Sequence, residues 1–130
     1  MSFAEVHSHR LYVELLLRAE RVGEALAAAR ANGAPIKTWS QLADLHAATD
    51  PHTAIGLYFD CADFALKDYR RPESPAPGPF ISNAWQLASD TSTFRTFNAR
   101  LRSLFAKEEV PRELGGQLEA AGIPVGKLLR

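Results

Sequence analysis

The sequence predicts an all-α domain of about seven helices, arranged as stacked antiparallel helical hairpins that C-terminal helices close. Apolar residues recur at helical spacing along the chain, and no segment shows sustained strand alternation or a hairpin turn pair. A weak internal repeat, 27 to 29 residues apart, predicts a helix, a short turn and a helix in each copy. With 130 residues and 46% hydrophobic content, the chain fits one domain over residues 1–130.

The N-terminal part predicts two helices, over residues 8–20 and 24–31. Leucine and valine crowd the first helix, and Gly23 marks the break before the second, which is rich in alanine. Asn32 and Gly33 favour the left-handed conformation of a helix C-terminus, and Pro35 prevents the helix from continuing.

The next two helices are predicted from their start signals. Thr38 and Gln41 have the spacing of a capping box, which predicts a helix to about residue 48. Asp50 followed by Pro51 is a strong helix start, which predicts a helix over residues 51–69. The apolar arc of this helix is roughly 220° wide, so it should be the central helix of the domain. Its polar stripe should face water, and consists of Gly56, Asp60, Asp63 and Lys67.

The C-terminal half begins with a proline-rich loop at residues 71–79, which contains four prolines. A helix is predicted over residues 80–89, followed by one over residues 93–108 with Ser92 as its N-cap. Pro111 opens a short helix to about residue 121. The tail should pack against the other helices through Ile123, Val125, Leu128 and Leu129.

Composition limits the partners and the compartment. The single cysteine excludes an internal disulfide and fits a reducing compartment, and no apolar run approaches the roughly 20 residues of a membrane helix. We therefore expect a cytoplasmic protein without a membrane partner. A net charge of zero argues against a dedicated nucleic-acid binder, and no cofactor motif is present.

Residues 42–64 gather two histidines, four aspartates and the cysteine, and are the best candidate for a chemical site. On helices these residues disperse. Cys61 falls in an apolar arc as a buried thiol, and His52 lies about 13 Å from it along the helix axis, too far for a catalytic pair. His46 falls on an apolar face, where one ring nitrogen should bond to a carbonyl group. The alternative hypothesis is a small metal-dependent enzyme or metalloprotein that uses His46, although tight metal-ligand spacing is missing.

The repeat also carries a resemblance to known helical families. The pattern W-x2-L-A, then DP-x2-A-x3-Y, resembles tetratricopeptide-like repeats, and it is similar to the helical region that follows the zinc finger in bacterial SWIM zinc-finger proteins. The residues that carry it are Trp39, Leu42, Ala43, Asp50, Pro51, Ala54, Tyr58 and Ala62. The resemblance implies a stacked-helix fold and an interaction role. No Cys-x-Cys and Cys-x-His motif is present, so a zinc-dependent role does not carry over.

The sequence therefore favours a non-catalytic interaction module that docks another protein or peptide on a helical-repeat surface. The expected partner contacts lie on the first and third predicted helices, and are Glu14, Arg18, Gln41 and Asp44. A nucleic-acid-associated accessory protein that uses the basic helix 93–108 is a further alternative. The wide apolar arc of helix 51–69 and the aromatic residues Phe80 and Trp85 are compatible with a homodimer.

Overall fold

The computed structural model describes residues 21–67, 69, 75–107 and 110–129, and this part of the chain is all-helical. It contains seven helices and no strand, which confirms the predicted all-α class. The helices are α2 (Val22–Asn32), α3 (Ile36–His46), α4 (Pro51–Lys67), α5 (Gly78–Gln86), α6 (Thr91–Phe105), α7 (Arg112–Ala120) and α8 (Val125–Leu128). The helix predicted over residues 8–20 lies outside the described residues.

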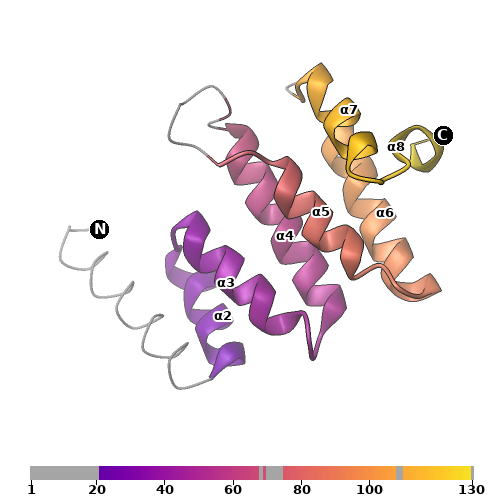
Figure 1. The fold of residues 1–130 in the computed structure, drawn as a ribbon. Helices are drawn as coiled ribbons and strands as arrows, with labels where there is room; N and C mark the ends of the chain where they lie inside the picture. The colour runs from indigo at the N-terminus through magenta and orange to yellow at the C-terminus, as the bar shows by residue number, and fades with distance from the viewer. Residues whose placement is uncertain (1–20, 68, 70–74, 108–109, 130) are drawn as a thin grey trace.

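The helices form two layers around α4 (Figure 1). Helices α3, α5 and α7 lie nearer the viewer in that figure, and α4 and α6 lie behind them. Helix α4 packs against α3, α5 and α6, whereas α3 and α5 make little contact with each other. The central position predicted for α4 from its wide apolar arc is thus confirmed, because its neighbours cover that arc.

An aromatic cluster joins three of these helices. The ring of Phe97 on α6 lies 5.3 Å from that of Phe59 on α4 and 5.1 Å from that of Trp85 on α5, measured between centroids. Both contacts are edge-on, an arrangement that aromatic rings favour. Phe59 and Phe97 are fully buried, so this cluster fixes how α4, α5 and α6 meet.

The predicted start of α4 is confirmed. The Asp50 carboxylate accepts hydrogen bonds from the Thr53 amide at 3.3 Å and from the Thr53 hydroxyl at 2.6 Å. Pro51 occupies the first helical position, where its missing N–H removes no helical bond.

The predicted capping box of α3 is wrong. The helix begins at Ile36, after Pro35, whose carbonyl accepts hydrogen bonds from the amides of Thr38 and Trp39. Thr38 therefore lies inside the first turn, where its side chain is buried and forms no cap. Proline placed the start two residues earlier because its fixed φ suits the residue that enters a helix.

The predicted N-cap of α6 is also wrong, because Asp90 replaces Ser92 in that role. The Asp90 carboxylate accepts from the Thr93 amide at 2.8 Å, and the Thr93 hydroxyl accepts from the Asp90 amide at 3.1 Å. These reciprocal bonds make a capping box in which threonine stands at the third position.

Two boundaries in the C-terminal half differ from the prediction. Helix α5 spans Gly78–Gln86 instead of 80–89, so the last two residues of the predicted loop 71–79 form its first turn. Pro79 fits there because first-turn amides have no helical partner. Residues 71–74 of that loop lie outside the described residues.

The predicted packing of the tail is confirmed, and part of it forms α8. Ile123, Val125 and Leu128 are buried, and Leu129 packs against the same core. Gly122 links α7 to this segment with φ of 93°, a left-handed conformation that glycine adopts without steric cost.

None of the helices in the described ranges is long and apolar enough to cross a membrane.

Candidate functional site

Two of the four predicted partner contacts can be placed in the structure. Gln41 and Asp44 are both exposed on α3, in the front layer of Figure 1. Glu14 and Arg18 lie outside the described residues. The structure therefore places two of the predicted contacts, both exposed on α3.

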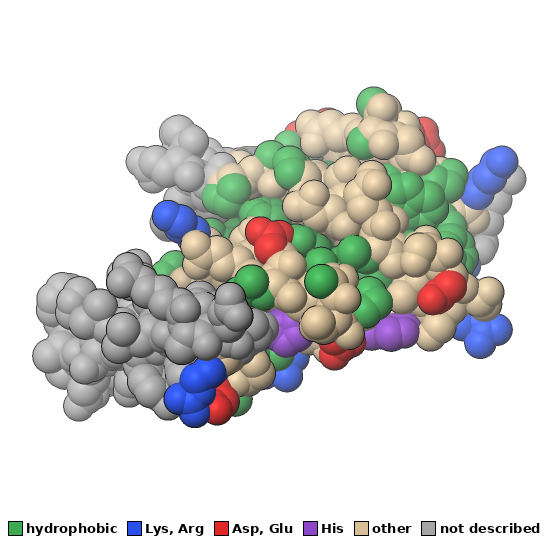
Figure 2. Space-filling view, turned by 60° about the horizontal axis from the view of Figure 1, so that its bottom comes forward, with side chains coloured by type: hydrophobic (Ala, Val, Ile, Leu, Met, Phe, Trp, Pro, Cys, Tyr) green, Lys and Arg blue, Asp and Glu red, His purple; other side chains and the backbone are tan. Residues whose placement is uncertain are grey.

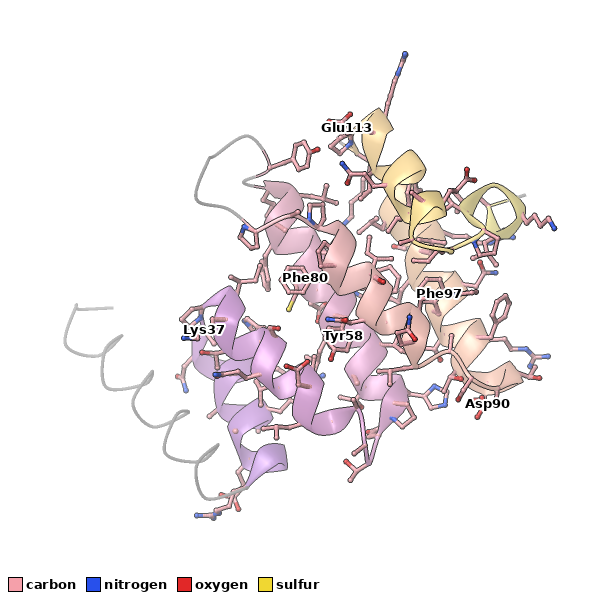
Figure 3. All side chains as sticks on the ribbon, in the orientation of Figure 1. Lys37, Tyr58, Phe80, Asp90, Phe97 and Glu113 are labelled. Carbon is pink, nitrogen blue, oxygen red and sulfur yellow. The ribbon has the colours of Figure 1, made fainter. Side chains whose placement is uncertain are left out.

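Asp44 is held in place by α4. Its carboxylate accepts a short hydrogen bond from the hydroxyl group of Tyr58, a residue that is only 5% exposed. Burial, followed by the bond to Asp44, raises the pKa of Tyr58 well above its usual value, so the phenol keeps its proton and donates. Figure 3 shows Tyr58 and Phe80 between α3 and α5 in that view, and the bond to Tyr58 ties Asp44 to α4.

The segment that contains α5 has no charge. Residues 75–89, which include all of α5, contain no Asp, Glu, Lys, Arg or His. At the chain average of 23% charged residues, about three of these fifteen would be charged. We call their solvent-accessible side chains the uncharged surface. Its exposed members are Pro75, Ala76, Pro79, Asn83, Gln86 and Ser89, and its half-buried members are Phe80, Ser82, Trp85, Leu87 and Ala88.

The uncharged surface has a central position. Helix α5 lies between α3 and α7 in the front layer of Figure 1. In the space-filling view of Figure 2, Lys and Arg side chains lie only around the periphery of the face that is seen. In the sequence, the uncharged surface corresponds to an interval of fifteen residues without charge. Helical periodicity alone does not reveal such an interval.

A shallow depression of about 380 Å³ opens where α5 meets α7. The residues that line it are Gly78, Pro79, Ser82, Asn83, Gln117, Leu118 and Ala121. None of them is charged, so the depression extends the uncharged surface onto α7.

His46 and Cys61 are packing residues, as the sequence predicted. The Nδ1 atom of His46 lies 2.9 Å from the carbonyl oxygen of Leu42, so Nδ1 carries the proton. Burial raises the pKa of the Cys61 thiol to about 12, which keeps the sulfur protonated and unreactive. Among the described residues, no three His, Cys, Asp or Glu side chains are grouped as metal ligands would be.

His52 connects α4 to the start of α6, a link that the sequence did not reveal. Its Nδ1 lies 2.7 Å from the Thr96 hydroxyl oxygen, and its Nε2 lies 3.0 Å from that of Ser92. The Thr96 hydroxyl donates to the Ser92 carbonyl at 3.3 Å, so it accepts from Nδ1–H. Nε2 then accepts from the Ser92 hydroxyl, and every hydrogen bond in this chain has a donor and an acceptor.

This arrangement contains the hydrogen bond of a serine nucleophile with a histidine base. Acyl transfer also needs hydrogen-bond donors that stabilise an oxyanion. The Asp90 carboxylate already accepts from the Thr93 amide at the start of α6, and its negative charge would repel an oxyanion there. What the geometry shows is a connection between α4 and α6.

One arginine of α6 and the lysine that follows the helix form ion pairs with α4. Arg100 contacts Asp60 at 2.7 Å and Asp63 at 3.9 Å, and Lys107 contacts Asp63 at 2.6 Å. The prediction that Asp60 and Asp63 face only water is thus wrong, because α6 lies along the polar stripe of α4. Phosphate binding needs cationic groups that are available to the ligand, so these pairs weaken the case for nucleic-acid binding through residues 93–108.

Comparison of the chain with protein-family models, curated protein sequences and solved structures finds no match.

Proposed function

We propose that this protein is a non-catalytic interaction module whose protein partner docks on the uncharged surface, with Asp44 at its border. The observation that carries the proposal is the absence of charge from fifteen consecutive residues, which comprise all of α5 and the segments on either side of it. Charged residues are depleted at the centres of protein interfaces, because burying an unpaired charge is costly. A surface without charge loses little when a partner displaces its water.

The half-buried aromatic residues support this assignment. Phe80 and Trp85 both keep part of their side chains accessible on α5. Aromatic side chains are enriched at interfaces, since they bury a large apolar area with few rotatable bonds. Asp44, fixed by Tyr58, would supply one oriented charge at the border of this apolar centre.

The layered arrangement supports a tetratricopeptide-like array as the scaffold. Helix α3 packs against α4, and α5 packs mainly against α4 while its Trp85 contacts Phe97 of α6. Helices α3 and α5 lie in the same layer. In a stacked array of this kind, neighbouring first helices together present an extended binding surface. Residues 75–89 would then belong to the binding layer, and α4 and α6 to the supporting layer.

The test is affinity purification from the source cell with quantitative mass spectrometry. The doubly substituted variant Asp44→Lys, Gln86→Lys places charge on both sides of the docking surface, and should lose the proteins that the unmodified chain recovers. Ser103→Lys is the matched control, because Ser103 is exposed on α6 in the other layer. Circular dichroism should show equal helix content in all three proteins.

Recovery of the same proteins by the double variant would overturn the proposal. Equal loss with Ser103→Lys would overturn it as well, because the effect would then follow from any added charge.

A further inference from the structure

The depression between α5 and α7 combines an apolar base with unpaired neutral polar groups. Leu118 and Pro79 contribute the apolar part. The side chains of Ser82, Asn83 and Gln117 also line it, and none of these three forms a side-chain hydrogen bond within the described part of the chain. The depression therefore offers several donors and acceptors to a ligand.

The two primary amides narrow the chemistry of that ligand. Each amide of Asn83 and Gln117 presents N–H donors and a carbonyl acceptor on one planar group. In an extended chain the main-chain N–H and C=O of one residue point to the same side, so a primary amide can accept from that N–H and donate to that C=O. Ser82 can add a third contact, because its hydroxyl both donates and accepts.

Other ligand classes fit less well. A phosphate or carboxylate would need a cation, and a cationic ligand would need a carboxylate, but none of the lining residues is charged. The volume of about 380 Å³ falls at the lower end of the roughly 300–1,000 Å³ typical of ligand sites. An open depression of this size suits a short stretch of a longer chain that continues past it on both sides.

We propose that this depression binds an extended, uncharged segment of a partner polypeptide through its main chain, with Asn83 and Gln117 as the residues that contact the peptide units. The inference rests on the proposed interaction function and names the chemistry of one part of the partner. Gln117 lies close to α5, since its Oε1 is 3.8 Å from the position that a Cβ at Gly78 would take. The glutamine amide therefore lies beside the first turn of α5.

The experiment is selection of a phage-displayed library of random twelve-residue peptides on the full chain. Enriched peptides should share a short segment without charged residues, and their dissociation constants should rise at least about tenfold for Asn83→Ala, Gln117→Ala. Ser103→Ala is the control, because Ser103 is exposed on α6, outside the uncharged surface, and does not line the depression. Methylation of main-chain nitrogens within the shared segment should weaken binding to the same extent.

Three outcomes would overturn the inference. They are the absence of any enriched peptide, enrichment of peptides whose shared segment is charged, and equal binding to the double alanine variant. Thermal unfolding separates these from misfolding, because neither amide forms an internal bond and both variants should melt as the unmodified protein does.

The outcome for the proposed function is separate. If Asp44→Lys, Gln86→Lys abolishes partner recovery while the peptide selection fails, the interaction surface stands and only the depression is misassigned. If recovery is unchanged by those charges while peptides still bind through the two amides, the depression is a peptide site that works without the uncharged surface around it.

Discussion

Phe97 is the side chain on which the junction of α4, α5 and α6 most depends, because it is fully buried between the rings of Phe59 and Trp85. We expect Phe97→Ala to lower the free energy of unfolding by about 3–5 kcal/mol, from lost burial and the cavity that remains. Phe94→Ala is the control, since Phe94 is only half-buried and touches Trp85 from the same helix. Urea denaturation should show a clearly smaller loss for the control, and equal losses would contradict the central role of Phe97.

The His52 link is a second prediction about individual residues. Substituting His52 with alanine removes its bonds to Ser92 and Thr96, and should lower the free energy of unfolding by about 1 kcal/mol. A double-mutant cycle with Ser92→Ala isolates one of the two bonds. Additive effects of the two substitutions would mean that the bond does not contribute to stability.

The sequence predicted which residues are buried better than it predicted their partners. His46 and Cys61 follow from helical periodicity, because their positions on a wheel coincide with apolar faces. The bond from His52 to Ser92 joins residues forty positions apart, so it depends on how α4 and α6 pack. No local pattern specifies that packing.

At the scale of the helix, two residues two positions apart, Asp90 and Ser92, are candidates for the N-cap of α6. Asp90→Ala should lower the melting temperature by a few degrees, because the first-turn amide of Thr93 loses its acceptor. Ser92→Ala should have a smaller effect, limited to its contact with His52. The reverse ranking in differential scanning calorimetry would restore Ser92 as the cap.

The ion pairs between α4 and α6 give a further prediction at this scale. In a double-mutant cycle with Arg100→Gln and Asp60→Asn, we expect a coupling energy of about 0.2–1 kcal/mol, since both side chains are partly exposed. The coupling should decrease as salt is raised from low to high concentration. A coupling energy of zero at low salt would show that the pair does not stabilise the helix packing.

Helix boundaries were predictable where one residue type dominates the local energetics. Asp50 and Pro51 specify the start of α4 because a cap and a fixed φ act at the same place. At α3, Pro35 and the Thr38 spacing gave competing starts, and burial of Thr38 decided between them. Burial of one threonine depends on neighbouring helices, so the sequence could not settle this boundary.

At the scale of the whole molecule, two capped helices make stability depend on pH. The side-chain hydrogen bond from Thr53 lowers the pKa of Asp50, and the backbone hydrogen bond from Thr93 lowers that of Asp90. The ordinary value is 3.8, so the folded protein binds fewer protons than the unfolded chain near this pH. Both contributions are complete above the ordinary pKa and are lost as the pH falls through the lowered values.

We therefore expect the melting temperature to fall as the pH is lowered from about 5 to about 2, and to fall less in the variant Asp50→Asn, Asp90→Asn. Asparagine keeps a side-chain oxygen as the acceptor for the cap but does not titrate in this range. Melting curves across this range provide the measurement. Identical pH profiles for the two proteins would show that other carboxylates control acid unfolding.

The all-helical class and the central place of α4 were predictable because periodicity over long segments reports them directly. The candidate site was less predictable, for a different reason. Asp44 was predicted as a partner contact from its position on a helix. The uncharged surface is instead defined by the absence of charged residues from the interval 75–89. Its link to the depression depends on α7, which lies next to α5 only after the chain folds.

The pairing of α4 with α6 through Asp60, Asp63, Arg100 and Lys107 has a consequence for how this fold can evolve. A substitution that reverses the sign of one member leaves two like charges facing each other across the helices. Related proteins that lose Arg100 should therefore also change at an aspartate position. Replacement of an acidic residue by a basic one on α4 should accompany the opposite replacement on α6. Correlated variation at these four positions would thus identify distant relatives that share this packing after the rest of their sequences have diverged.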